Sequence, residues 1–198
     1  MKKVSLILLT VALGIFQACN SDNNDSVDAA NEANENKDSS AVTTNGDTAR
    51  IAAVPVDEDD AEFAVAAANG GMMEVELGKY ASQNAMSQRV KDFAAMIVRD
   101  HTAANDELKA LAMSKNITLP ATVGDDARKH MDEMMKMKGK DFDKHYMDMM
   151  LDDHKKDVKA FEKAAKDCKD PELKSFAGKT LPVLMAHLDS SKAINGKK

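Results

Sequence analysis

The chain has 198 residues, with 33 acidic and 27 basic side chains, a formal net charge of −6, two cysteines and no tryptophan. This length allows one ordinary domain with extensions. Two cysteines exclude a disulfide scaffold, and four prolines and nine glycines are too few for the many turns of an all-β sandwich. The negative charge argues against a general nucleic-acid binder, which needs a basic surface to neutralise phosphates.

Residues 1–18 have the pattern of a signal peptide of the lipoprotein type. Lys2 and Lys3 precede the apolar run 4–16, which is shorter than the roughly 20 residues of a membrane span. The run ends in a small residue followed by Cys19, which resembles a relaxed lipobox, and cleavage there leaves Cys19 for lipidation. We therefore expect an exported outer-membrane lipoprotein, anchored to the membrane through Cys19 on the periplasmic or cell-surface side. An ordinary secretion signal with an incidental cysteine is the alternative.

Residues 19–57 read as a disordered acidic tether. Between residues 20 and 57, eight acidic side chains stand against only Lys37 and Arg50, and Asn, Ser and Ala supply most of the rest. Such a segment has too little apolar surface to offset its chain entropy. We therefore expect the folded domain to cover residues 58–196.

From Glu58 onward, apolar residues recur at spacings of three and four, which predicts helices. The first expected helix ends near Met86, and Ser87 is the expected N-cap of the second, which continues to Leu111. The stretch 116–124 is the longest break, and a short amphipathic helix is expected over 125–137.

A third helix is expected from Phe142 to Ala165. The fourth begins at Asp170-Pro171, where an aspartate cap precedes a proline in the first turn, and it extends to Ile194. Short connections within each pair predict two antiparallel hairpins. The fold class is therefore all-α: an antiparallel four-helix bundle with a short extra helix in the middle connection.

Each long helix carries one metal-competent side chain among apolar neighbours, at a position that periodicity places on its buried face. These residues are Glu74, His101, His154 and His187. In an antiparallel hairpin, two residues equally far from the turn are level. Glu74 and His101 are centred on the turn at Ser87, and His154 and His187 are centred on the turn at Asp170. The four side chains are therefore expected to meet in the middle of the bundle, where such folds build their sites.

Three imidazoles and one carboxylate suit a single Zn²⁺, Cu²⁺ or Fe²⁺ ion. Asp157 and Asn105 are additional candidate ligands on the same faces, whereas Asp100 and Asp153 fit surface or outer-sphere roles. The Glu-x-x-His motif of di-iron bundles is absent before His101, His154 and His187, which argues against a ferroxidase. The four residues could equally form a metal-free polar network that fixes the helix register.

A second hypothesis rests on the stretch 130–154, which contains seven methionines and three histidines. Thioether and imidazole ligands suit Cu(I), and an exported protein could use them to buffer copper. The alternative, which we favour, is that methionine fills a core that is poor in aromatic side chains.

Four phrases of the sequence resemble one bacterial family. They are GGMMEVELGKYA, VKDFAAMIVRDHTAANDELKALA, FDKHYMDMMLDDH and FAGKTLPVLMAHL. Together they resemble domain of unknown function 4142 over nearly all of residues 60–194. The resemblance implies a ferritin-like four-helix bundle in an exported protein, and it implies no reaction.

The expected function is therefore an envelope lipoprotein that binds one transition-metal ion through the four residues, for stress tolerance or metal handling. One alternative is an interaction module with a structural His/Glu core, and another is a metal-dependent oxidoreductase. No catalytic residue and no protein partner can be named from the sequence.

Overall fold

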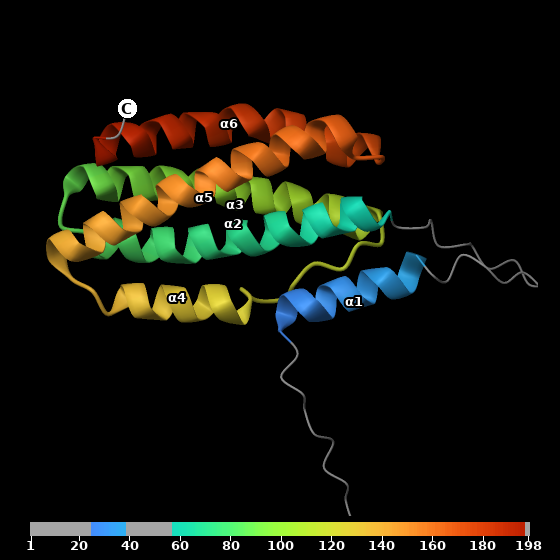
Figure 1. Ribbon diagram of the computed structural model, residues 1–198, viewed down its shortest axis with the longest axis horizontal. Coiled ribbons are helices and arrows are strands. Elements are labelled where there is room, and N and C mark those ends of the chain that lie inside the picture. The colour runs from blue at the N-terminus through green and yellow to red at the C-terminus, as the bar shows by residue number, and fades with distance from the viewer. Residues whose placement is uncertain (1–24, 39–56, 197–198) are drawn as a thin grey trace, which may run out of the picture.

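Two antiparallel helical hairpins make up the bundle. In the computed structural model the first hairpin is α2 (Glu58–Asn84) with α3 (Gln88–Ser114), and the second is α5 (Gly139–Asp167) with α6 (Pro171–Asn195). Helix α2 packs on α3 and α5, and α6 packs on α5 and α3, so that the four long helices enclose one core (Figure 1). The prediction of an all-α bundle is confirmed. The short helix α4 (Asp125–Met135) covers part of α2 and α5, within the range expected for the middle connection.

The structure describes residues 25–38 and 57–196. The predicted signal peptide, residues 1–18, and the predicted lipidation site Cys19 lie outside the described residues, as does the part of the tether between 39 and 56. None of the described helices combines the length and the apolar character that a crossing of the bilayer requires.

Each hairpin turn is held by a carboxylate of the other hairpin. Asp60, in the first turn of α2, accepts hydrogen bonds from two backbone N–H groups of residues 169–170, at 3.0 and 2.7 Å. Asp143, near the start of α5, accepts from two backbone N–H groups of residues 86–87, at 2.8 and 2.7 Å. Ser87 occupies the predicted N-cap position of α3, but its side chain makes no capping bond. Asp60 and Asp143 together fix the height of one hairpin against the other.

Helix α1 (Ser26–Asp38) lies inside the predicted tether, so the prediction of disorder is wrong for these residues. Asn34 is 5% exposed and pairs with the backbone of Thr118 in both directions: its amide nitrogen donates to the carbonyl at 2.9 Å, and its oxygen accepts from the N–H at 2.7 Å. Ala30 is buried, and Lys37 donates to a backbone carbonyl of the α3–α4 connection. Helix α1 docks mainly through polar contacts. Such contacts are not visible in the average hydropathy of a segment.

The core is divided into two apolar clusters by a layer of buried polar residues. The first cluster includes Leu77, Phe93, Ile97, Tyr146 and Met150. The second includes Ala64, Leu108, Phe161, Phe176 and Leu184. On every long helix one buried polar residue falls where one cluster gives way to the other, and these four residues are Glu74, His101, His154 and His187.

The methionines of residues 130–154 belong to the first cluster. Four are buried and three are partly buried against it: Met131, Met134, Met147 and Met150, with Met135, Met137 and Met149. The two remaining histidines of the stretch, His130 and His145, are exposed. This placement agrees with methionine as a core-filling side chain, so the hypothesis of a Cu(I) site in this stretch finds no support.

Candidate metal centre

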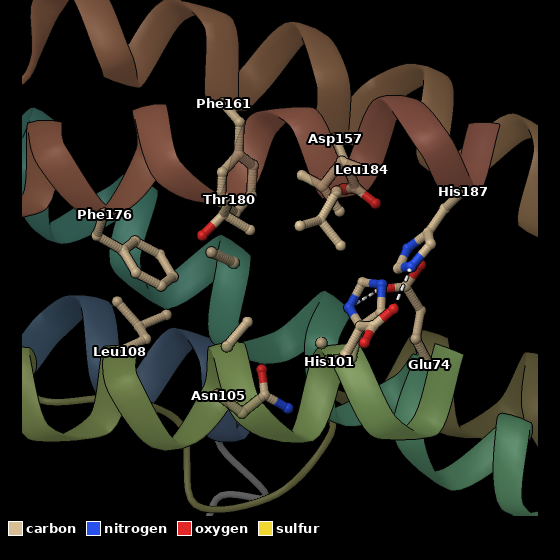
Figure 2. Close-up of a pocket in the computed structure, with 15 residues that line it drawn as sticks. Glu74, His101, Asn105, Leu108, Asp157, Phe161, Phe176, Thr180, Leu184 and His187 are labelled. Atoms are coloured by element: carbon tan, nitrogen blue, oxygen red, sulfur yellow. Dashed lines mark hydrogen bonds and ion pairs between the residues drawn. The ribbon is translucent and has the colours of Figure 1, made fainter. Parts of the chain in front are cut away.

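The four predicted residues meet in the bundle interior. Glu74 is 2% exposed, His101 6%, His154 0% and His187 1%. One ring nitrogen from each of the three histidines lies within 4.8 Å of those from the other two. Figure 2 shows Glu74, His101 and His187 approaching one another from three different helices. The level argument from the sequence thus places the four side chains together, as the structure does.

Each imidazole has one nitrogen turned outward, toward an acceptor. His101 Nδ1 lies 2.8 Å from Glu74 Oε2. His154 Nδ1 lies 2.9 Å from the carbonyl oxygen of Met150, one helical turn earlier. His187 Nε2 lies 3.0 Å from Asp100 Oδ2. Carbonyls and ionised carboxylates only accept hydrogen bonds, so the protons of His154 and His187 are assigned to the nitrogens that face Met150 and Asp100. The proton of His101 is assigned to Nδ1 when Glu74 is ionised.

The other three nitrogens comprise one close pair and one atom without a partner. His154 Nε2 lies 3.2 Å from His187 Nδ1, and His101 Nε2 is buried with no hydrogen-bond partner among the described residues. If every ring is neutral and donates to its acceptor, all three of these nitrogens carry lone pairs. The close pair then accommodates a proton or a metal ion between its two nitrogens, whereas a His154 ring with its proton on Nε2 forms an ordinary N–H···N hydrogen bond to His187.

Burial keeps the imidazoles neutral. Desolvation lowers the pKa of His101 and of His154 to about 4, against partial compensation by nearby carboxylates. Burial also lowers the pKa of His187, and the hydrogen bond to Asp100 opposes this shift. A neutral imidazole is the form that binds a metal ion. The three rings are therefore in the ligand state near neutral pH.

The carboxylates around the rings divide into two kinds. Burial raises the pKa of Glu74, and it also raises the pKa of Asp157, which Glu74 raises further. Asp100 is only half-buried, and its hydrogen bond with Arg99 holds its pKa below the usual range. Asp100 is therefore a reliable anionic acceptor for His187, whereas the charge of Glu74 depends on what positive charge lies beside it.

The two additional candidate ligands differ in position. Asp157 offers an oxygen within 4.8 Å of a ligand atom of Glu74 and one of His154, so it can reach the edge of the site. The Asn105 amide instead packs against the backbone of Gly71, where a Cβ would lie 2.1 Å from Asn105 Oδ1. Asp153 carries a buried carboxylate oxygen near the same edge, and this oxygen has no hydrogen-bond partner within the described part of the chain.

One outer partner was not assigned from the sequence. The Met150 carbonyl is a main-chain group, and no residue pattern marks it. Asp100, for which a surface or outer-sphere role was expected, lies beside a histidine of another helix: it reaches His187 because α3 and α6 are neighbours in the bundle. Three imidazoles, each oriented by an acceptor on its far nitrogen, form the arrangement typical of histidine-ligated Zn²⁺, Cu²⁺ or Fe²⁺ sites.

Comparison with known proteins identifies the family of the chain. The family model described as domain of unknown function (DUF4142) matches residues 45–194, which contain all four residues of the site. No curated protein and no solved structure matches the chain. Since the match covers most of the sequence, the chain belongs to the DUF4142 family.

Proposed function

We propose that the protein binds one transition-metal ion through His101, His154 and His187. The observation that carries the proposal is the meeting of three buried imidazoles, with one ring nitrogen of each within 4.8 Å of the others, while one nitrogen of each ring faces an oxygen acceptor. Burial of an imidazole costs desolvation free energy unless its nitrogens find hydrogen-bond or metal partners. Apolar packing alone therefore does not explain three buried imidazoles. A divalent ion satisfies all three at once.

The distance between His154 Nε2 and His187 Nδ1 fits a bound metal ion as well as it fits a shared proton. Two imidazole nitrogens bound to one tetrahedral ion at about 2.0–2.1 Å lie about 3.3 Å apart. The observed separation of His154 Nε2 from His187 Nδ1 is 3.2 Å. A proton between these two nitrogens leaves His101 Nε2 unsatisfied, whereas a metal ion engages it. We therefore favour the metal ion.

Glu74 takes an outer position in this proposal, which refines the sequence-based expectation that it is a ligand. Its carboxylate lies against Nδ1 of His101 at 2.8 Å and Nδ1 of His154 at 3.4 Å. A carboxylate on the far nitrogen of a ligating histidine orients the ring and strengthens it as a ligand. The charge of Glu74 also offsets that of a divalent ion, which in turn favours the ionised carboxylate.

We further propose that this site serves metal handling or stress tolerance on an envelope-anchored lipoprotein. The support is the sequence alone: the N-terminal signal pattern, the cysteine at its end, and the acidic stretch that follows. Globomycin-sensitive processing and radiolabelled-palmitate incorporation, both lost in Cys19→Ala, test the anchor independently of the metal.

Metal analysis of the tag-free full-length chain tests the site. After exposure to Zn²⁺, Co²⁺ or Cu²⁺ and gel filtration, we expect one ion per wild-type chain and none in His154→Gln. His145→Gln is the matched control, because His145 lies on the same helix and also contacts the carbonyl four residues earlier, but is exposed. Circular dichroism confirms that each variant is folded.

A metal-free wild-type chain after this exposure would refute the proposal. The layer would then be a structural polar network in which His154 and His187 share a proton. That alternative has its own signature, a strongly downfield N–H proton resonance coupled to both rings, which a bound metal ion would abolish.

A further inference from the structure

A hollow adjoins the proposed metal centre on one side. It is enclosed by α2, α3, α5 and α6 and holds about 450 Å³ of empty space, its open mouth included. Glu74, His101 and His187 form one end, and Leu108, Phe161 and Phe176 form the other (Figure 2). Val183, which is 39% exposed, stands at its rim.

His101, which carries an unpartnered nitrogen, belongs to the wall of this hollow. His101 is 6% exposed, it lines the hollow, and its Nε2 atom has no partner among the described residues. Figure 2 shows the ring of His101 projecting from α3 into the space below Asp157 and Leu184. His154 does not line the hollow and is completely buried, so it closes the far side of the cluster.

This arrangement defines where a further ligand can bind. Three histidines leave at least one coordination position of a transition-metal ion open. Because His154 closes one side while His101 and His187 line the hollow, the open position faces the hollow. Resting on the metal site proposed above, we infer that the ion takes an exogenous ligand there, of the class of water-sized oxygen or nitrogen donors such as hydroxide, hydrogen peroxide or azide.

The size of the hollow sets the class of ligand. Only about 30 Å³ of it is open to the centres of water-sized molecules, which is room for about two waters. Aromatic rings and leucine side chains close the end away from the histidines, so an organic substrate or a peptide does not fit. Asn105, Asp157 and Thr180 supply polar groups along the walls, which favours a ligand that can form hydrogen bonds.

The inference is tested with azide on the Co²⁺- or Cu²⁺-loaded full-length chain. We expect a ligand-dependent change in the visible spectrum that saturates with azide and does not appear with imidazole, which is too large. Ala104→Leu fills the hollow one turn from His101 and should weaken azide binding at least tenfold while the chain still holds one ion. Ala103→Leu, an exposed neighbour on α3, is the matched control and should bind azide like the wild type.

The outcomes separate this inference from the proposed function. A chain that binds no metal refutes the function itself. A chain that holds one ion but binds no azide refutes the open position, as does one that binds imidazole as well as azide. If Ala104→Leu is folded and metal-loaded yet binds azide with unchanged affinity, the hollow is not the seat of the ligand. Should Ala104→Leu fail to fold, the azide and imidazole comparison in the wild type decides the matter.

Discussion

His154 Nε2 lies 3.2 Å from His187 Nδ1, although the outer nitrogen of each ring already faces an acceptor. Each neutral imidazole has one N–H, and when both rings donate to their outer acceptors, two lone pairs meet at this contact. A metal ion or a shared proton relieves that arrangement, and so does a shift of the His154 proton to Nε2, which forms an N–H···N hydrogen bond. The outer acceptors therefore decide, through the tautomers, how well the two rings can bind a metal ion.

Asp100→Asn should lower the affinity for Zn²⁺ about 10- to 100-fold, the usual cost of losing an outer-sphere partner of a metal ligand. The asparagine amide can donate to His187 Nε2, which moves the ring proton to Nδ1 and removes the lone pair that faces the metal. Competition with a chelator measures the change. Asp106→Asn, an exposed substitution on the same helix, should leave the affinity unchanged.

Zn²⁺ binding should resist acid. Protons compete with the metal for imidazole, so binding weakens as the pH falls through the pKa values of the ligands. Three ordinary histidines with pKa near 6.5 would lose affinity roughly 10³-fold between pH 7 and 5.5. Because burial lowers the pKa of His101 and of His154 to about 4, we expect a loss well under 10²-fold. A loss near 10³-fold in a pH-resolved titration would contradict the neutral, buried state of these rings.

Two neighbouring glycines should respond in opposite directions to alanine. A Cβ at Gly71 would meet Asn105 Oδ1 at 2.1 Å, whereas a Cβ at Gly70 meets no atom within 4 Å. Gly71→Ala should therefore lower the free energy of unfolding by about 1–3 kcal/mol, and Gly70→Ala should raise it by up to about 1 kcal/mol through helix propensity. Urea denaturation measures both, and Gly71→Ala combined with Asn105→Ala should recover part of the loss.

Asn34→Ala should release α1 without unfolding the bundle. The substitution removes two hydrogen bonds to the backbone N–H and carbonyl of the half-buried Thr118, at a cost of about 1–3 kcal/mol. Amide hydrogen exchange should accelerate in residues 26–38 while protection in α2 and α5 persists. Asn31→Ala makes the same chemical change elsewhere on α1 and should have a smaller effect. Equal acceleration in both variants would mean that α1 docks through its apolar contacts instead.

Much of the fold could be predicted from the sequence because each long helix is encoded by local patterns of apolar and capping residues. Periodicity and punctuation predicted the four long helices, and Asp170 caps α6 as expected, accepting from the backbone N–H groups of Glu172 and Leu173. The level argument worked because an antiparallel hairpin with a short turn has only one register. It predicted the pair within each hairpin, whereas the meeting of the two pairs also depends on the height of one hairpin against the other, which Asp60 and Asp143 help to fix.

The rest depended on contacts between distant segments. Helix α1 was missed because its sequence is polar and its docking rests on Asn34 and the Thr118 backbone, far apart in the chain. The contact of Asp100 with His187 requires knowing that α3 and α6 are neighbours. The hollow beside His101 is defined by the sizes of side chains from four helices, which no local pattern encodes.

The docking of α1 has a mechanical consequence for a chain whose Cys19 carries lipid. With α1 docked on the bundle, the linker between a lipid on Cys19 and the folded protein is residues 19–25, whose fully extended length is at most about 20 Å. With α1 released, the linker becomes residues 19–57, whose fully extended length is at most about 130 Å. In the lipoprotein proposed above, release of Asn34 from Thr118 would therefore let the bundle move farther from the membrane surface.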